Sequence, residues 1–97
     1  MRTLEKIKTI LKEHREILEA KYKVKSIGIF GSFLKGTQRK KSDIDILVEF
    51  NDAIDIFEFL DLEEYLETLL GTKVDLVSKK ALKPYIGKRI LEEVVYL

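Results

Sequence analysis

The stretch that decides the fold runs from Gly31 to Val48 and reads GSFLKGTQRKKSDIDILV. From Asp43 to Phe50 every second residue is apolar, and the residues between them are acidic except for Leu47. Successive side chains of a β-strand point to opposite faces of the sheet, so this alternation predicts a strand over 43–50. One face would carry Ile44, Ile46, Val48 and Phe50, and the other Asp43, Asp45, Leu47 and Glu49.

The beginning of the same stretch predicts a turn that could bind an anion. Residues 24–30 are short and rich in β-branched side chains, which predicts a strand ending at Gly31 and Ser32. Free backbone N–H groups and a hydroxyl at such a turn suit a phosphate, but Gly31 and Ser32 taken alone favour a plain turn with a serine cap. The polar segment 31–42 is expected to contain a short helix. Its basic residues are either phosphate ligands or solvated surface: Lys35, Arg39, Lys40 and Lys41.

Outside this stretch the pattern predicts three further helices and one further strand. Apolar residues at three- and four-residue steps indicate a helix over 3–23. Asp55 and Glu58 form a potential capping box, and the helix that they begin should end at Gly71. A strand is expected over 73–78, and a last helix from Pro84 with Val95 on its apolar face. The predicted fold class is α/β (α+β): a small mixed three-stranded sheet flanked by about four helices, in the order α-β-α-β-α-β-α.

Composition excludes several classes of protein. The 97 residues suit one domain, spanning 1–97, and the formal net charge of +1 argues against a nucleic-acid-binding surface. The absence of cysteine excludes disulfides and thiolate metal sites. No apolar run approaches the ~20 residues of a membrane span, and the N-terminus lacks the apolar core of a signal peptide. We therefore expect a cytoplasmic protein without a membrane segment.

The near-zero net charge conceals a segregation. Residues 49–72 contain eight acidic residues and no Lys or Arg, whereas 1–48 contain twelve basic and six acidic residues. The acidic segment is either solvated surface or a surface for a basic partner. On its predicted helix Phe57 and Phe59 cannot both face the core, so one of them is a candidate for a partner contact.

Three carboxylates interrupt otherwise apolar strands. Asp43 and Asp45 are two residues apart, so they share a strand face with about 6.6–6.8 Å between them. Asp75 lies in the middle of the next strand and would point the same way if the two strands are neighbours. Hard oxygen donors favour Mg²⁺ or Mn²⁺ over Zn²⁺, and two such ions can serve an in-line phosphoryl displacement. Each carboxylate taken alone also fits solvated surface.

Together, these features resemble the signature of the nucleotidyltransferase superfamily that includes DNA polymerase beta. The family pattern is Gly-Ser, a second Gly, then Ser-Asp-hydrophobic-Asp, with a third Asp on the following strand. The small size and the C-terminal sequence are most similar to the minimal nucleotidyltransferases. Lys35 stands where the family often has Arg, which changes how a triphosphate is held because Lys lacks the bidentate fork of Arg. The matching residues are Gly31, Ser32, Gly36, Ser42, Asp43, Asp45 and Asp75.

The resemblance implies a nucleotidyltransferase fold and an enzyme that transfers AMP from ATP, with two Mg²⁺ ions. Asp43, Asp45 and Asp75 would be both the catalytic residues and the metal ligands, with Asp75 also helping to deprotonate the acceptor. Gly31 and Ser32 would bind the nucleotide phosphates, assisted by the loop that follows. Minimal nucleotidyltransferases are similar to antitoxins whose partner is a HEPN-domain ribonuclease toxin, modified on a tyrosine hydroxyl.

Two alternatives share the same sequence features. The chain could neutralise a toxin by masking its surface without catalysis, or it could transfer a nucleotide to a small molecule. A homo-oligomer is compatible with a core this small. His14, on the apolar stripe of the first helix, is interpreted as a core or boundary residue and not as a ligand.

Overall fold

The computed structural model describes residues 4–31, 44–81 and 84–97, and for 84–86 it describes the backbone alone. The short helix expected within 31–42 therefore lies outside the described residues. So do five of the candidate site residues: Ser32, Lys35, Gly36, Ser42 and Asp43.

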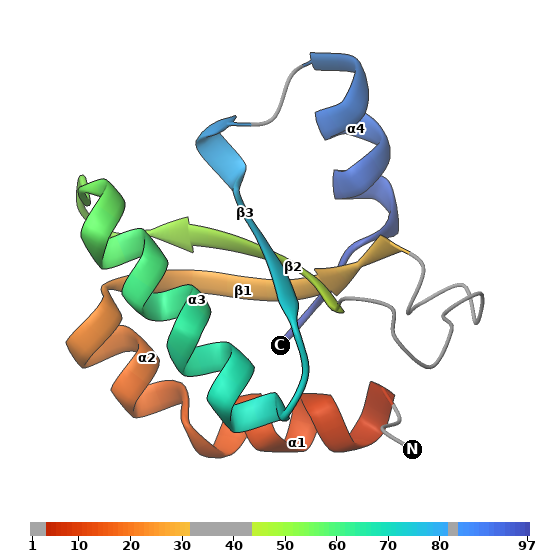
Figure 1. Cartoon of the computed structure of the whole chain (residues 1–97). Helices are drawn as coiled ribbons and strands as arrows, with labels where there is room; N and C mark the ends of the chain where they lie inside the picture. The colour runs from red at the N-terminus through yellow and green to blue at the C-terminus, as the bar shows by residue number, and fades with distance from the viewer. Residues whose placement is uncertain (1–3, 32–43, 82–83) are drawn as a thin grey trace.

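A mixed sheet forms the centre of the molecule (Figure 1). Its strands are β1 (Val24–Phe30), β2 (Ile44–Phe50), β3 (Val74–Ser78) and β4 (Val95–Tyr96), in the spatial order β3-β2-β1-β4. β2 pairs antiparallel with β1 and parallel with β3, and β1 pairs antiparallel with β4. The predicted mixed α/β class is confirmed.

The number of strands predicted was wrong, because β4 is a fourth strand. Helix α4 (Pro84–Glu93) begins at the expected proline but ends before Val95, which pairs with Ile29 of β1. The expected helix therefore does not include Val95. Gly28 explains why the end of the chain lies against β1: a Cβ at Gly28 would come within 2.6 Å of the Val94 side chain. Short apolar runs rich in valine fit a helix or a strand equally well, so the sequence could not decide between them.

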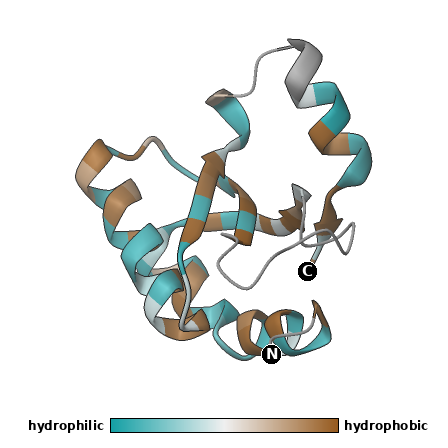
Figure 2. Ribbon diagram, turned by 45° about the vertical axis from the view of Figure 1, so that its right-hand side comes forward, coloured by the Kyte–Doolittle hydropathy of each residue, from teal (hydrophilic) through white to brown (hydrophobic). Residues whose placement is uncertain are grey.

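Three helices cover one face of the sheet (Figure 1): α1 (Leu4–Glu13), α2 (Arg15–Tyr22) and α3 (Ile56–Leu70). β2 alternates as predicted, because Ile44, Ile46 and Val48 are buried on this face. Strands β1, β2 and β3 and the three helices share one hydrophobic core, and the apolar stretches of the ribbon are brown in Figure 2. The core residues of the helices are Ile7, Leu11, Leu18, Leu62, Leu66 and Leu70.

The single helix expected over 3–23 is two helices that meet at His14. The His14 backbone N–H donates to Leu11 O at 3.2 Å, three residues back, and its ring Nδ1 lies 2.8 Å from Ile10 O. In a continuous helix Ile10 O would accept a hydrogen bond from the His14 backbone N–H. Here the imidazole contacts that oxygen instead, and the chain turns at His14. His14 is half-buried and hydrogen-bonded, which confirms that it is a boundary residue.

Helix α3 begins and ends where the sequence predicts. The Asp55 side chain accepts a hydrogen bond from Glu58 N at 2.8 Å, and the Glu58 side chain accepts one from Asp55 N at 3.3 Å. Gly71 ends the helix with a left-handed φ of 67°.

Replacing Asp55 by Ala should lower the free energy of unfolding by about 1 kcal/mol, because the Glu58 N–H loses its acceptor. Urea titration followed by circular dichroism measures the change. Asp52→Ala is the matched control, since it also removes one exposed carboxylate near the helix start but no cap. Equal losses in the two variants would show that charge, and not capping, accounts for the effect.

Candidate functional site

Two of the three predicted carboxylates lie side by side on neighbouring strands. β2 and β3 are adjacent and parallel, and Asp45 and Asp75 are register partners. Partners in adjacent strands point to the same face of a sheet. Because Ile44 and Ile46 face the helical core, Asp45 and Asp75 face away from it. Asp45 is half-buried and Asp75 is exposed, so one carboxylate is held by the fold and the other is open to solvent.

Gly31 brings the end of β1 against Asp45. It follows Phe30, the register partner of Asp45, and it has a left-handed φ of 79°. A Cβ at this position would overlap the Asp45 carboxylate and lie 2.9 Å from its Cγ. Glycine is required here both for the backbone conformation and for the close approach. The end of β1 therefore lies directly against Asp45, whose register partner on β3 is Asp75.

The two carboxylates suit a magnesium ion. Mg²⁺ takes few protein ligands, keeps several waters and is completed by substrate phosphates. Over the ranges that the structure covers, no three His, Cys, Asp or Glu side chains gather into a group that could hold a metal ion. Asp43, the third expected ligand, lies outside those ranges but precedes Asp45 by two residues, as two ligands on one strand face do. The donors present fit the ion, and they do not form a closed metal site.

Farther along the same face of β2, Glu49 belongs to a different environment. Its carboxylate lies 3.8 Å from Lys79 Nζ, which follows β3, and accepts a hydrogen bond from the Ser26 hydroxyl at 3.4 Å. Glu49 was expected on the same face as Asp45, and the structure confirms that placement through the partner pairs Ser26–Glu49 and Phe30–Asp45. Glu49 therefore has a structural role: its ion pair links β2 to the segment after β3, and its hydrogen bond links β2 to β1.

A cleft that the sequence did not predict lies at the other end of β2. Its volume is about 370 Å³, and it opens between the β2–α3 loop, the start of α3 and the segment after β3. The residues that line it include Phe50, Ile54, Ile56, Phe59 and Lys80. The one signal in the sequence was the pair of phenylalanines on α3: Phe59 packs against Phe50, whereas Phe57 is 74% exposed.

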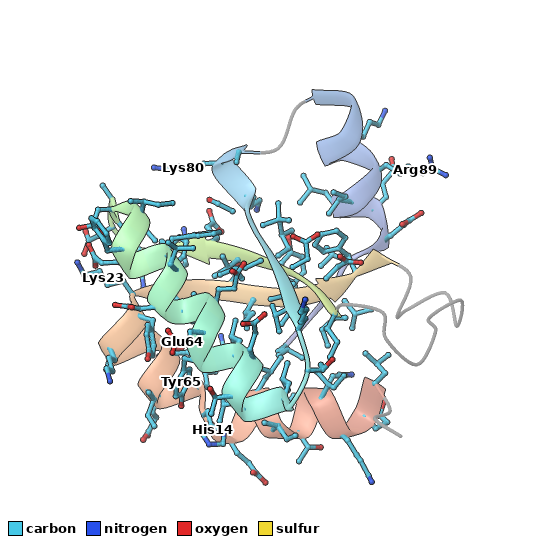
Figure 3. The ribbon with its side chains drawn as sticks, in the orientation of Figure 1. His14, Lys23, Glu64, Tyr65, Lys80 and Arg89 are labelled. Carbon is cyan, nitrogen blue, oxygen red and sulfur yellow. The ribbon has the colours of Figure 1, made fainter. Side chains whose placement is uncertain are left out.

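Helix α3 also carries much of the acidic segment. In Figure 3 Glu64 and Tyr65 lie next to each other on α3, with His14 below them. Tyr65 stacks on Tyr22 with 4.9 Å between the ring centroids. Burial raises the pKa of the Tyr22 hydroxyl above its ordinary value, and the negative charges of Asp61 and Glu64 raise it further. Asp61 and Glu64 of α3 therefore lie close enough to Tyr22 of α2 for their negative charges to act on its hydroxyl.

Within the described parts of the chain, no helix has the length and apolar character needed to cross a membrane.

The sequence matches the model of a known family and several curated proteins. Residues 11–97 match the model of the nucleotidyltransferase domain. A protein of Thermococcus cleftensis named protein adenylyltransferase MntA is 48% identical, over 100% of this chain and 98% of its own length. A relative in Methanocaldococcus jannaschii is 56% identical over the whole of both chains.

Solved structures agree with the sequence matches. A structure described as a minimal nucleotidyltransferase is 31% identical and superimposes with a TM-score of 0.76, over 94% of this chain and 95% of the other. A toxin–antitoxin structure with AMP-PNP is 29% identical with a TM-score of 0.73, over 93% of this chain and 70% of the other. The structural similarity therefore extends over more than nine tenths of this chain.

Proposed function

This chain belongs to the nucleotidyltransferase domain family, and from that premise we propose that it is an antitoxin that transfers AMP from ATP to a tyrosine hydroxyl of a HEPN-type toxin. The observation that carries the proposal is the pairing of Asp45 with Asp75 on adjacent strands, closed on one side by Gly31. The name of the Thermococcus relative supports protein adenylylation. The toxin–antitoxin structure that contains AMP-PNP supports both the partner and the nucleotide.

The residues of the site suit an in-line transfer. Asp43, Asp45 and Asp75 would hold two Mg²⁺ ions, which would neutralise the phosphate charge and stabilise the attacking and leaving oxygens. The backbone at Gly31 and Ser32 would bind the nucleotide phosphates, with Lys35, Gly36 and Ser42 in the loop beside them. Asp75, the exposed carboxylate, would accept the tyrosine proton. The tyrosine oxygen then bonds to the α-phosphorus, the α–β phosphoanhydride bond breaks, and pyrophosphate leaves.

Asp45 has a different role in this scheme. It is half-buried beneath Gly31, so its carboxylate has little freedom to move. A metal ligand fixed in this way reduces the reorganisation needed when charge develops during the reaction.

We also propose that the reaction takes place in the cytoplasm, where ATP is available.

Mass spectrometry of the cognate toxin tests the function directly. Incubation of the two proteins with ATP and Mg²⁺ should add the mass of AMP to a toxin tyrosine, and the modified toxin should no longer cleave RNA or inhibit growth. Omitting ATP is the control. If the toxin is neutralised to the same extent without ATP, the protein acts by masking. If the toxin is unchanged but a small hydroxyl compound is adenylylated, the acceptor assignment is wrong.

A further inference from the structure

Apolar side chains gather on the surface where α3 begins. Among the large hydrophobic residues of the described chain that are exposed, three lie within the first two turns of this helix. Ile56 is 60% exposed, Phe57 is 74% exposed and Leu60 is 48% exposed. Figure 2 shows this end of α3 as a hydrophobic region at the edge of the molecule. Isolated exposed apolar residues are ordinary, but a contiguous group of this kind marks an interaction site.

The group borders the cleft at the end of β2. Ile56 is part of the cleft wall, and Phe50, Ile54 and Phe59 form its apolar lining. Three acidic residues and one lysine also line the cleft: Glu49, Asp52, Asp55 and Lys80. A shallow apolar hollow beside an exposed apolar helix turn can accept a large side chain from another polypeptide.

The surface around this group is acidic. Phe57, Asp61, Glu64 and Thr68 follow one another at helical spacing and are all exposed, so they form the outer stripe of α3. Among the described residues, the first turns of α3 form one ion pair, between Glu58 and Lys23 at 3.2 Å. Asp61 and Glu64 have no cation within ion-pair distance among the residues that the structure covers. A partner that presents Lys or Arg would therefore find unpaired carboxylates here.

The charge identifies the kind of occupant. A second copy of this chain, bound through a two-fold axis, would place the same patch against itself. Its acidic residues would then face like charges, which repel each other at a close interface. A different protein with apolar side chains flanked by Lys or Arg satisfies both the apolar group and the carboxylates.

We propose that the start of α3, with the adjoining cleft, is the docking surface for a segment of the toxin that presents apolar side chains flanked by Lys or Arg. This proposal rests on the proposed function and adds to it the place at which the partner binds. The surface lies at the Phe50 end of β2, about 17 Å along the strand from Asp45 at ~3.3 Å per residue. Docking there leaves the carboxylate end of the sheet open for the acceptor tyrosine.

Two leucines of similar exposure provide a matched test. Leu60→Ser removes an apolar side chain from the docking surface, and Leu91→Ser removes one from α4, where Leu91 is 41% exposed. Isothermal titration calorimetry with the catalytically inactive, full-length toxin should show a Kd raised about tenfold or more by Leu60→Ser and unchanged by Leu91→Ser. Equal effects of the two substitutions, or an unchanged Kd for Leu60→Ser, would overturn the docking surface.

A charge reversal tests the same surface without altering its packing. Glu64→Lys exposes no core residue, and it should raise the Kd for the toxin most strongly at low ionic strength. A Kd that does not respond to this change contradicts the expected basic partner. Self-association of the wild-type protein that is lost in Leu60→Ser would instead assign the surface to a second copy.

Measurements on the wild-type protein distinguish a failure of the proposed function from a failure of the docking surface. If it neither binds nor modifies the toxin, the proposed function fails and the docking surface fails with it. If it modifies the toxin while Leu60→Ser and Glu64→Lys bind normally, the function stands and only the docking surface is wrong.

Discussion

Replacing Asp45 by Asn is expected to lower the rate of AMP transfer by at least about a hundredfold, while the protein remains folded. Losing one charged contact to the reacting groups costs about 10²–10³ in rate in enzymes that rely on electrostatic stabilisation. Asn has nearly the same shape as Asp, so it fits beneath Gly31 and keeps the packing. It cannot supply the negative charge that a magnesium ion requires. Initial rates of toxin adenylylation, measured over a range of Mg²⁺ concentrations, give the result.

Glu49→Gln is the control for this substitution. It makes the same carboxylate-to-amide change on the same face of the same strand, four residues along. Glu49 pairs with Lys79 at 3.8 Å and is half-exposed, so its loss should cost little stability and leave transfer unchanged. If both variants transfer AMP equally well, Asp45 is not part of the reaction. If both lose activity, the effect comes from the charge of the sheet face and not from the site.

Much of the fold could be predicted because its signals are local. The strand at 44–50 follows from a two-residue alternation, and the limits of α3 follow from Asp55, Glu58 and Gly71. What escaped prediction depends on contacts between distant residues. β4 pairs with β1 at Gly28, where the lack of a side chain leaves room for Val94, 66 positions away in the sequence.

The same distinction applies to the site. The spacing of Asp43 and Asp45 can be obtained from sequence, but the position of Asp75 depends on which strands are neighbours and on their register. The close approach of Gly31 to Asp45 is also invisible in the sequence, because it depends on how β1 and β2 are paired. The apolar start of α3 escaped for a related reason: an apolar helix residue does not reveal whether it is buried until its neighbours are known.

Gly31 offers the second substitution with a large expected effect. Gly31→Ala forces an L-residue into a left-handed conformation and places a methyl group where the Asp45 carboxylate lies. The backbone conformation alone should cost about 1–2 kcal/mol in the free energy of unfolding. The methyl group must also push the carboxylate aside, and a displacement of about 1 Å in a catalytic group can cost about a hundredfold in rate. We therefore expect losses of both stability and AMP transfer.

Gly71→Ala separates these two effects. Gly71 also has a left-handed φ, 67° against 79° for Gly31, but it caps α3. The two substitutions should therefore share the cost of the left-handed backbone in urea titrations, while only Gly31→Ala lowers the rate of transfer measured well below the unfolding temperature. If Gly31→Ala is destabilised like Gly71→Ala but remains fully active, the reaction does not need the Asp45 carboxylate to be held against Gly31. Transfer lost only in Gly31→Ala would mean that glycine is required there for the placement of Asp45, beyond its role in the turn.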